Sequence, residues 1–268
     1  MPTNVHEIDY DLKGTEMQCV EIELDPGESA IAEAGSLMYM EDGIEMETIF
    51  GDGSERGPGG LLGKFVGAGK RLLTGESLFM TVFTNTSQGK KHVTFASPYP
   101  GKIIPLDLSQ YDNQIICQKD TFLAGAKGIS IGIAFQKRIG VGFFGGEGFI
   151  MQKIEGDGMA FCHAGGTIVK KELQPGEIVR VDTGCLVAMT SNVNYDIQFV
   201  KGIKTALFGG EGLFFATLQG PGTVWLQSLP FSRLASRVFA AAPQGQGKDK
   251  GEGSLGGFLF DTFMGNDD

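Results

Sequence analysis

A short Gly-Glu signature recurs three times in this chain, beginning at Gly75, Gly146 and Gly210, with intervals of 71 and 64 residues. The last two copies lie in nearly identical hexamers, Phe-Gly-Gly-Glu-Gly-Phe and Phe-Gly-Gly-Glu-Gly-Leu. Self-similarity at such a period is typical of one structural unit repeated along the chain. The sequence therefore predicts three tandem modules, and any functional site has to be sought within each module and where modules meet.

A second marker precedes the signatures. Leu24–Glu28 and Leu173–Glu177 both read Leu-x-Pro-Gly-Glu, and Leu106–Ser109 occupies the corresponding place in the middle. Pro-Gly favours a tight turn, because proline presets φ and glycine accepts a positive φ. The runs between turns are short, and Val20–Leu24 alternates apolar with acidic residues, as half-buried strands do. We expect about six antiparallel strands in each module.

The predicted fold class is all-β: three tandem β-sandwich or double-stranded β-helix-like modules in a pseudo-threefold arrangement, with a short C-terminal helix over Pro230–Ala242. Three modules in one chain imply either a pseudo-threefold body or one third of a larger ring. The expected boundaries are 1–98 for the first module, with a basic amphipathic insertion near 51–74, 99–164 for the second, 165–229 for the third, and 230–268 for the helix, a flexible linker and an acidic tail.

Composition narrows the function. The 42 glycines are balanced by 41% apolar residues, enough for a core, and the net charge of −10 argues against a nucleic-acid partner. The four cysteines are dispersed in apolar stretches, which predicts buried free thiols. The start lacks a signal-like segment and no apolar run reaches about 20 residues, so we expect a soluble, cytoplasmic protein. The three histidines do not cluster, so no metal or cofactor is expected, and His163 is expected at the solvent or an interface.

The Pro-Gly turns, the paired hexamers and the run Glu33–Met40 (Glu-Ala-Gly-Ser-Leu-Met-Tyr-Met) resemble the altered-inheritance-of-mitochondria family over residues 6 to about 240. The resemblance implies three tandem modules similar to the subunit of the trp RNA-binding attenuation protein (TRAP-like), commonly assembled as a homotrimer. It also implies an association with mitochondrial inner-membrane organisation in eukaryotes and no settled biochemistry in prokaryotes. RNA binding is not carried over, because basic residues do not recur at equivalent positions of the three units.

The repeated carboxylates Glu76, Glu147 and Glu211 have two interpretations. Three equivalent carboxylates can converge on an axis and bind a cation. Alternatively, Gly-Glu-Gly at a strand entry forms a bulge whose carboxylate accepts backbone N–H groups. We favour the structural interpretation.

The first module carries extra chain before its signature. Its turn leucine and signature glutamate are 52 residues apart, against 41 and 38 in the other modules. The spacing of the apolar residues predicts one face of a helix, with basic residues beside it. A basic amphipathic segment can contact a membrane surface or an acidic protein partner, and a flap that packs on its own module or subunit interface is the alternative. The contact residues that we expect are Leu61, Leu62, Lys64, Phe65, Val66, Lys70, Arg71, Leu72 and Leu73.

These observations predict a non-enzymatic scaffold or interaction protein, assembled as a homotrimer and able to associate peripherally with membranes. The alternative is a protein that binds a small molecule or a metal, with an enzyme as one possibility, whose site lies at a module or subunit boundary.

Overall fold

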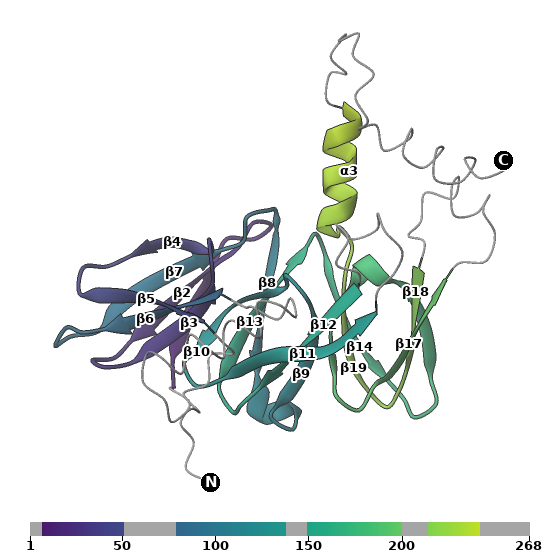
Figure 1. The fold of residues 1–268 in the computed structure, drawn as a ribbon, viewed down its shortest axis with the longest axis horizontal. Helices are drawn as coiled ribbons and strands as arrows, with labels where there is room; N and C mark the ends of the chain where they lie inside the picture. The colour runs from purple at the N-terminus through teal and green to yellow at the C-terminus, as the bar shows by residue number, and fades with distance from the viewer. Residues whose placement is uncertain (1–6, 51–78, 138–148, 200–213, 242–268) are drawn as a thin grey trace, which may run out of the picture. The chain divides into compact units, whose positions relative to one another are not determined.

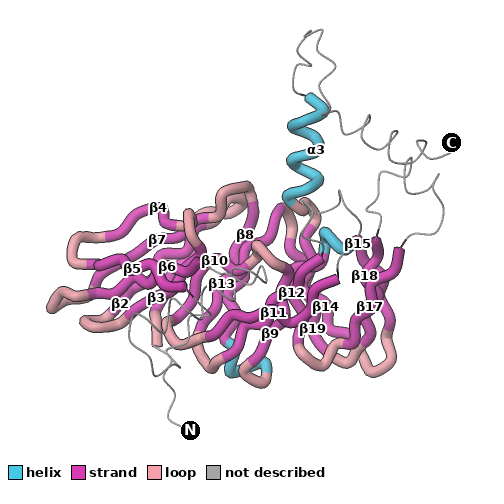
Figure 2. Tube along the Cα trace, viewed as in Figure 1, coloured by secondary structure: helices cyan, strands magenta, loops and turns pink. Residues whose placement is uncertain are grey.

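The computed structural model describes residues 7–50, 79–137, 149–199 and 214–241 (Figure 1). They form nineteen β-strands and one α-helix near the C-terminal end, α3 (Phe231–Ala241), as Figure 2 shows by colour. The prediction of an all-β chain with a short C-terminal helix is therefore confirmed. Within the described residues, no helix has the length and apolar character that crossing a bilayer requires.

The strands that follow β1 (Asp9–Lys13) fall into three successive sets of six. Set 1 contains β2 (Cys19–Leu24), β3 (Ser29–Glu33), β4 (Leu37–Met40), β5 (Ile44–Phe50), β6 (Phe79–Asn85) and β7 (Lys91–Ala96). Set 2 contains β8 (Gly101–Asp107), β9 (Gln114–Gln118), β10 (Phe122–Ala126), β11 (Ser130–Lys137), β12 (Phe149–Glu155) and β13 (Met159–Gly165). Set 3 contains β14 (Ile168–Leu173), β15 (Ile178–Asp182), β16 (Leu186–Thr190), β17 (Asn194–Phe199), β18 (Phe214–Gln219) and β19 (Gly222–Gln227).

Local sequence explains why these strands begin and turn where they do. In β2 the apolar residues are fully buried and the alternate glutamates face outward, which is the period of a strand with one covered face. The turn before β3 places Gly27 at φ 86°, and the turn before β15 places Gly176 at φ 79°. Both glycines adopt the backbone conformation for which glycine is favoured after proline in a tight turn.

The strands form four sheets, each with a simple order. Sheet 1 is β1-β2-β7-β4, sheet 2 is β5-β6-β3-β10-β13-β8, sheet 3 is β11-β12-β9-β16-β19-β14, and sheet 4 is β15-β18-β17. In every set the first, sixth and third strands lie together in one sheet, while the second, fifth and fourth lie together in the next. Sheets 2 and 3 are thus each shared by two sets.

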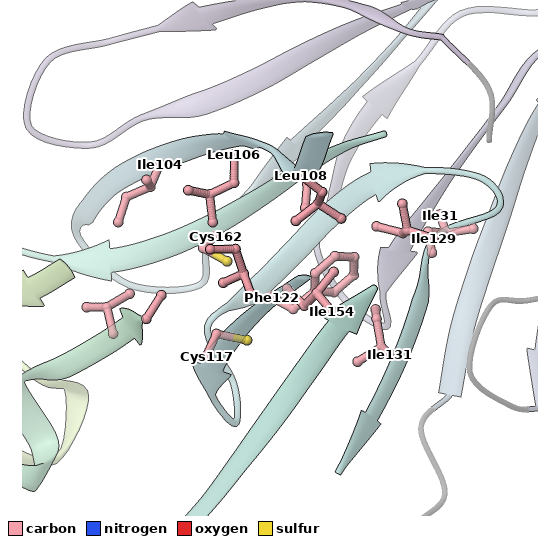
Figure 3. Packing of buried hydrophobic residues seen from close by; sticks show 14 of the residues in the cluster. Ile31, Ile104, Leu106, Leu108, Cys117, Phe122, Ile129, Ile131, Ile154 and Cys162 are labelled. Atoms are coloured by element: carbon pink, nitrogen blue, oxygen red, sulfur yellow. The ribbon is translucent and has the colours of Figure 1, made fainter. Parts of the chain in front are cut away.

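Three apolar clusters pack between successive sheets. The central cluster, part of which Figure 3 shows, draws residues from sheets 2 and 3, including Ile31, Leu106, Phe122 and Ile154. A second cluster joins sheets 1 and 2, and a third joins sheets 3 and 4. The central strands of sheets 2 and 3 therefore have apolar clusters on both faces.

Candidate functional site: two open strand edges

Two strand pairs join the sets, and they are built alike. The first joint is the antiparallel pair β3–β10, in which Ile31 faces Gly125, and the second is β9–β16, in which Ile116 faces Met189. In both, the third strand of a set lies beside the second strand of the preceding set. The pairing of β10 with β13 and of β16 with β19 shifts register at the same point, one residue after the strand begins. A bulge thus recurs at equivalent places.

The strand positions that form the joints, the third strand of one set and the second strand of another, are left open in the first and the last of the three sets. β4 is the third strand of set 1 and ends sheet 1 beside β7, while β15 is the second strand of set 3 and ends sheet 4 beside β18. Within the described residues, neither strand has a neighbour on its outer side. We call these two outer sides the β4 edge and the β15 edge.

Side-chain exposure separates the open edges from the joints. Every residue of β10 is buried, and so are the first four residues of β16. Every residue of β4 is exposed. Its four side chains are large and apolar: Leu37 at 37%, Met38 at 60%, Tyr39 at 42% and Met40 at 37%. Contiguous exposed apolar residues on a strand edge are typical of an interaction site, because an unpaired edge is also a template for another strand.

The β4 edge is held in place from its inner side. The Tyr39 hydroxyl donates a hydrogen bond across β7 to the Glu21 carboxylate on β2. The Glu41 N–H donates to the His92 carbonyl at 3.0 Å, and the His92 N–H donates to the Glu41 carboxylate at 3.0 Å. That backbone hydrogen bond lowers the pKa of Glu41. β4 is therefore an ordered strand that presents its other side.

The β15 edge is anchored at both ends of its strand. Before it, the Glu177 carboxylate accepts the Gln174 N–H at 3.0 Å and pairs with Lys171 at 2.8 Å. After it, the Asp182 carboxylate accepts the Gly184 N–H at 2.8 Å and pairs with Arg233 of α3 at 3.2 Å. Ile178, the first residue of β15, is 56% exposed.

A partly buried polar feature lies beside the first joint. A cavity of about 10 Å³, enough for one water molecule, is lined by residues of both sets, including Glu33 and Gln152. Burial raises the pKa of Glu33 to about 7, the negative charge of Asp120 adds to the rise, and Lys119 opposes it. An ionisable group at a joint is the kind of residue that the ligand-binding alternative requires.

His163 lies where the sequence did not predict. It is 3% exposed, so the expectation of a solvent or interface position is wrong. Its ring meets the Tyr99 ring edge-on with centroids 4.4 Å apart, and neither ring nitrogen has a hydrogen-bond partner within the described residues. Burial lowers the pKa of His163 to about 4. Residue 101 on the neighbouring strand β8 has to be glycine, because a Cβ there would lie 2.4 Å from Nε2 of His163.

Metal-ligand clusters and activated thiols are two kinds of group that support catalysis. The described residues contain no group of three or more His, Cys, Asp or Glu side chains arranged to hold a metal ion. Cys117 and Cys162 are buried, and both the hydrogen bond with Cys117 and burial raise the pKa of Cys162. A thiol that stays protonated is a poor nucleophile.

The residues that the sequence singled out are not placed by the structure. The insertion contacts, Leu61 to Leu73, and the signature carboxylates Glu76, Glu147 and Glu211 all lie outside the described residues. Sequence reasoning missed the β4 edge as a site, although its apolar run, Leu37–Met40, was already part of the family motif. The available signal was that Tyr39 and Met40 carry large side chains where the equivalent residues of the second set are Ala124 and Gly125.

The strand pairing defines the class of protein: an all-β chain in which successive six-strand sets share sheets. Comparison with known proteins then gives the family. The family described as mitochondrial biogenesis AIM24 matches residues 10–229, and the chain belongs to it. An uncharacterized protein of Streptococcus pyogenes serotype M6 is 32% identical over 222 residues, which is 82% of this chain and 84% of that protein.

A solved structure gives the same fold. The crystal structure of a Streptococcus pyogenes protein from a structural genomics programme matches with a TM-score of 0.68 and 25% identity, over 88% of this chain and all of that one. Neither description of a streptococcal protein states an activity or a ligand.

Proposed function

We propose that this protein is a non-enzymatic scaffold that acts in the cytoplasm by assembling with itself, as a homotrimer, and by presenting the assembly to other partners. The observation that carries the proposal is the contrast in exposure of the third strand of each set. That strand is buried at every residue of β10 and at the first four residues of β16, but exposed at every residue of β4. The repeated sequence signatures support treating the three sets as copies of one TRAP-like module, so an unfilled joint position at each end calls for another copy.

Self-assembly is tested on the full chain by light scattering after size exclusion and by native mass spectrometry across a hundredfold range of concentration. We expect one discrete species with the mass of three chains. A monomer at every concentration would refute the self-assembly.

Peripheral membrane contact is a separate part of the proposal and is carried by the sequence of the insertion, Leu61–Leu73. Its basic and apolar composition suits an anionic membrane surface. Flotation with anionic liposomes tests it, with Phe65→Glu as the variant that removes one apolar anchor. We expect the wild type to float and the variant to float less, and absence of flotation for both refutes this part.

The ligand-binding alternative is favoured by one observation, the raised pKa of Glu33 beside a cavity at the first joint. The size of the cavity suits a water molecule better than an organic ligand. Native mass spectra of the purified protein decide it. A retained small molecule or metal that is lost in Glu33→Gln supports a site here, and the same bound species, or none, in both proteins refutes it.

A further inference from the structure

We propose that the β15 edge of one copy pairs with the β4 edge of a second copy, antiparallel and in the register of the two joints. In this pairing Tyr39 faces Val181 and Met40 faces Arg180. The inference rests on the proposed self-assembly and deepens it, because it names the strands and the register that would hold the copies together.

The register follows from equivalent positions. Gly125 and Met189 are the residues of β10 and β16 that face a second strand at Ile31 and Ile116. Counting from the bulge of each strand makes Met40 the equivalent residue of β4, since β4 shifts register on β7 between Leu37 and Tyr39. Counting from the Pro-Gly turn makes Arg180 the equivalent of Ile31. The two open edges can therefore be aligned in the register of the joints.

On β4, the backbone N–H and carbonyl groups that the proposed pair requires point away from β7. Glu41 donates its N–H inward to β7, and N–H directions alternate along a strand, so the N–H and carbonyl of Met40 point outward. At the first joint the equivalent outward groups form hydrogen bonds with the neighbouring strand: the Lys127 N–H donates to the Ser29 carbonyl at 3.1 Å. Lys127 lies two residues beyond Gly125, on the same side of β10.

The β15 side is complementary. Gly220 donates its N–H to the Glu177 carbonyl at 3.0 Å, so Glu177 faces β18 and the backbone groups of Ile178 and Arg180 point outward. Within the described residues, both open strands therefore present backbone donors and acceptors that no neighbouring strand pairs. A pair formed between them satisfies these groups as β3–β10 does.

Side chains support the same pairing. Leu37 and Met40 face Phe95 and Val93 across β7, which are fully buried, so they lie at the rim of the cluster between sheets 1 and 2. At the first joint that rim position is covered by Ile31. On β15 the position is Arg180, whose aliphatic stem can cover Met40 while its charge stays near the acidic residues that follow β4, Glu41 and Asp42. Apolar cover and opposite charge coincide.

A second copy of this chain is the occupant that these features fit. The two edges differ from each other and lie on different strands of one chain, so pairing them joins copies head to tail. Head-to-tail contacts either close into a ring or extend into a filament. A ring of three copies leaves neither edge open, and it continues the joints that the chain already makes twice.

The first experiment removes one outward hydrogen bond. Met40→Pro deletes an N–H that points away from β7 and is tolerated by an edge strand for that reason. Glu172→Pro is the matched control, because β14 ends sheet 3 at an edge outside the proposed pair. The Thr167 carbonyl accepts the Ser228 N–H on the β19 side. Because these directions alternate along the strand, the N–H of Glu172 points outward. We expect Met40→Pro to be monomeric with wild-type circular dichroism, and Glu172→Pro to keep the wild-type mass.

The outcomes separate the two proposals. A wild type that is monomeric at all concentrations refutes self-assembly itself. A wild type that assembles while Met40→Pro, correctly folded, assembles equally well refutes the β4–β15 pairing and leaves self-assembly standing. If Met40→Pro does not fold, the cysteine experiment below decides.

The second experiment reads the register. Tyr39 and Val181 would form a non-hydrogen-bonded pair, whose close Cα atoms suit a disulfide. In a Cys19→Ser, Cys185→Ser background, we mix a Tyr39→Cys protein with a Val181→Cys protein under mild oxidation. We expect disulfide-linked dimers that contain one chain of each kind, and at least tenfold fewer with Val179→Cys, which lies two residues out of register on the same face.

Each single variant is its own control. Tyr39→Cys alone forming dimers would show that β4 pairs with β4 in a symmetric dimer and would overturn the proposal. A doubly substituted chain, Tyr39→Cys with Val181→Cys, that forms the bond only within one chain would show closure inside the monomer and would overturn it as well.

Discussion

The strands β10 and β4 hold the same position in their sets and carry the same bulge, yet their sequences are opposite in character. β10 reads Phe-Leu-Ala-Gly-Ala, with small residues where a neighbouring strand lies on each side. β4 reads Leu-Met-Tyr-Met and has a neighbour on one side among the described residues. At the first joint β10 lies between two strands and carries small side chains at Ala124–Ala126, whereas β16 at the second joint accommodates Met189. The open edge of β4 has room for large side chains, and these need something to cover them.

The largest effect should come from removing the side chain that fills a joint. Ile31 is fully buried, so Ile31→Ala should lower the free energy of unfolding by about 2–5 kcal/mol through lost burial and a residual cavity. Arg180→Ala is the equivalent change at the open edge and should alter it by less than about 0.5 kcal/mol. Urea unfolding measures the free energy of unfolding of both variants. The experiment is carried out in the Met40→Pro background, so that assembly does not contribute. Equal losses would erase the distinction between joint and edge.

A smaller effect is expected from enlarging the joint. A Cβ on Gly125 would lie 2.5 Å from Cδ1 of Ile129 and 2.8 Å from the Met159 carbonyl oxygen. The Ile129 side chain can move, but the backbone carbonyl cannot move without disturbing β13, so Gly125→Ala should cost about 1–3 kcal/mol. Met40→Ala at the equivalent edge position should change stability by about 0.5 kcal/mol or less in the monomer. Thermal unfolding of the two variants makes the comparison, and a neutral Gly125→Ala would contradict the crowding.

The next effect depends on pH and separates the first joint from the second. Glu33 has a pKa of about 7 in the folded chain against 4.5 for the free group, so between these values the folded state holds a proton that the unfolded state releases. Stability should therefore fall as pH rises from 4.5 to 7. Glu33→Gln removes that loss and should be more stable than wild type at pH 8 by about 1–3 kcal/mol, with little difference at pH 4.5.

The second joint supplies the precedent for this change, because Gln118 occupies the position equivalent to Glu33. Urea unfolding at several pH values follows the difference between Glu33→Gln and wild type. A difference that stays constant from pH 4.5 to pH 8 would show that the carboxyl of Glu33 does not titrate as its burial implies.

Local chemistry made part of this molecule predictable. The Pro-Gly turns and alternating runs led to the all-β class, and the apolar spacing after Pro230 led to the helix, because both signals are read within a few residues. Cys117 and Cys162 are buried as expected, but Cys19 and Cys185 are only partly buried. Apolar flanking residues do not reveal how far a strand lies from the sheet edge.

The open edges could not be predicted for a related reason. Whether Leu37–Met40 is covered depends on which distant strand lies beside it, and strand pairing is a long-range property. His163 shows the same limit, since its burial comes from Tyr99 and the neighbouring strand at Gly101 rather than from its own strand. The residues favoured at first, in the insertion and the signatures, remain predictions because they lie outside the described residues.

The smallest expected effect concerns how firmly the β15 edge is held. Asp182 ends β15, accepts the Gly184 N–H at 2.8 Å and pairs with Arg233 at 3.2 Å. Asp182→Ala removes both interactions and should cost about 1 kcal/mol, mainly through the lost cap of the short turn Thr183–Cys185. Arg233→Ala should cost less than about 0.5 kcal/mol, because its side chain is 41% exposed and solvent screens the pair.

Asp182→Asn separates the two contributions, since the amide oxygen can still accept the Gly184 N–H while the charge is lost. We expect its free energy of unfolding to lie close to that of Arg233→Ala and above that of Asp182→Ala. If Asp182→Asn instead matches Asp182→Ala, the charge pair with α3 and not the cap orders the end of β15. The edge would then depend on the helix for its shape, whereas β4 is ordered by hydrogen bonds within its own sheet, and the two halves of the proposed contact would differ in how readily they form.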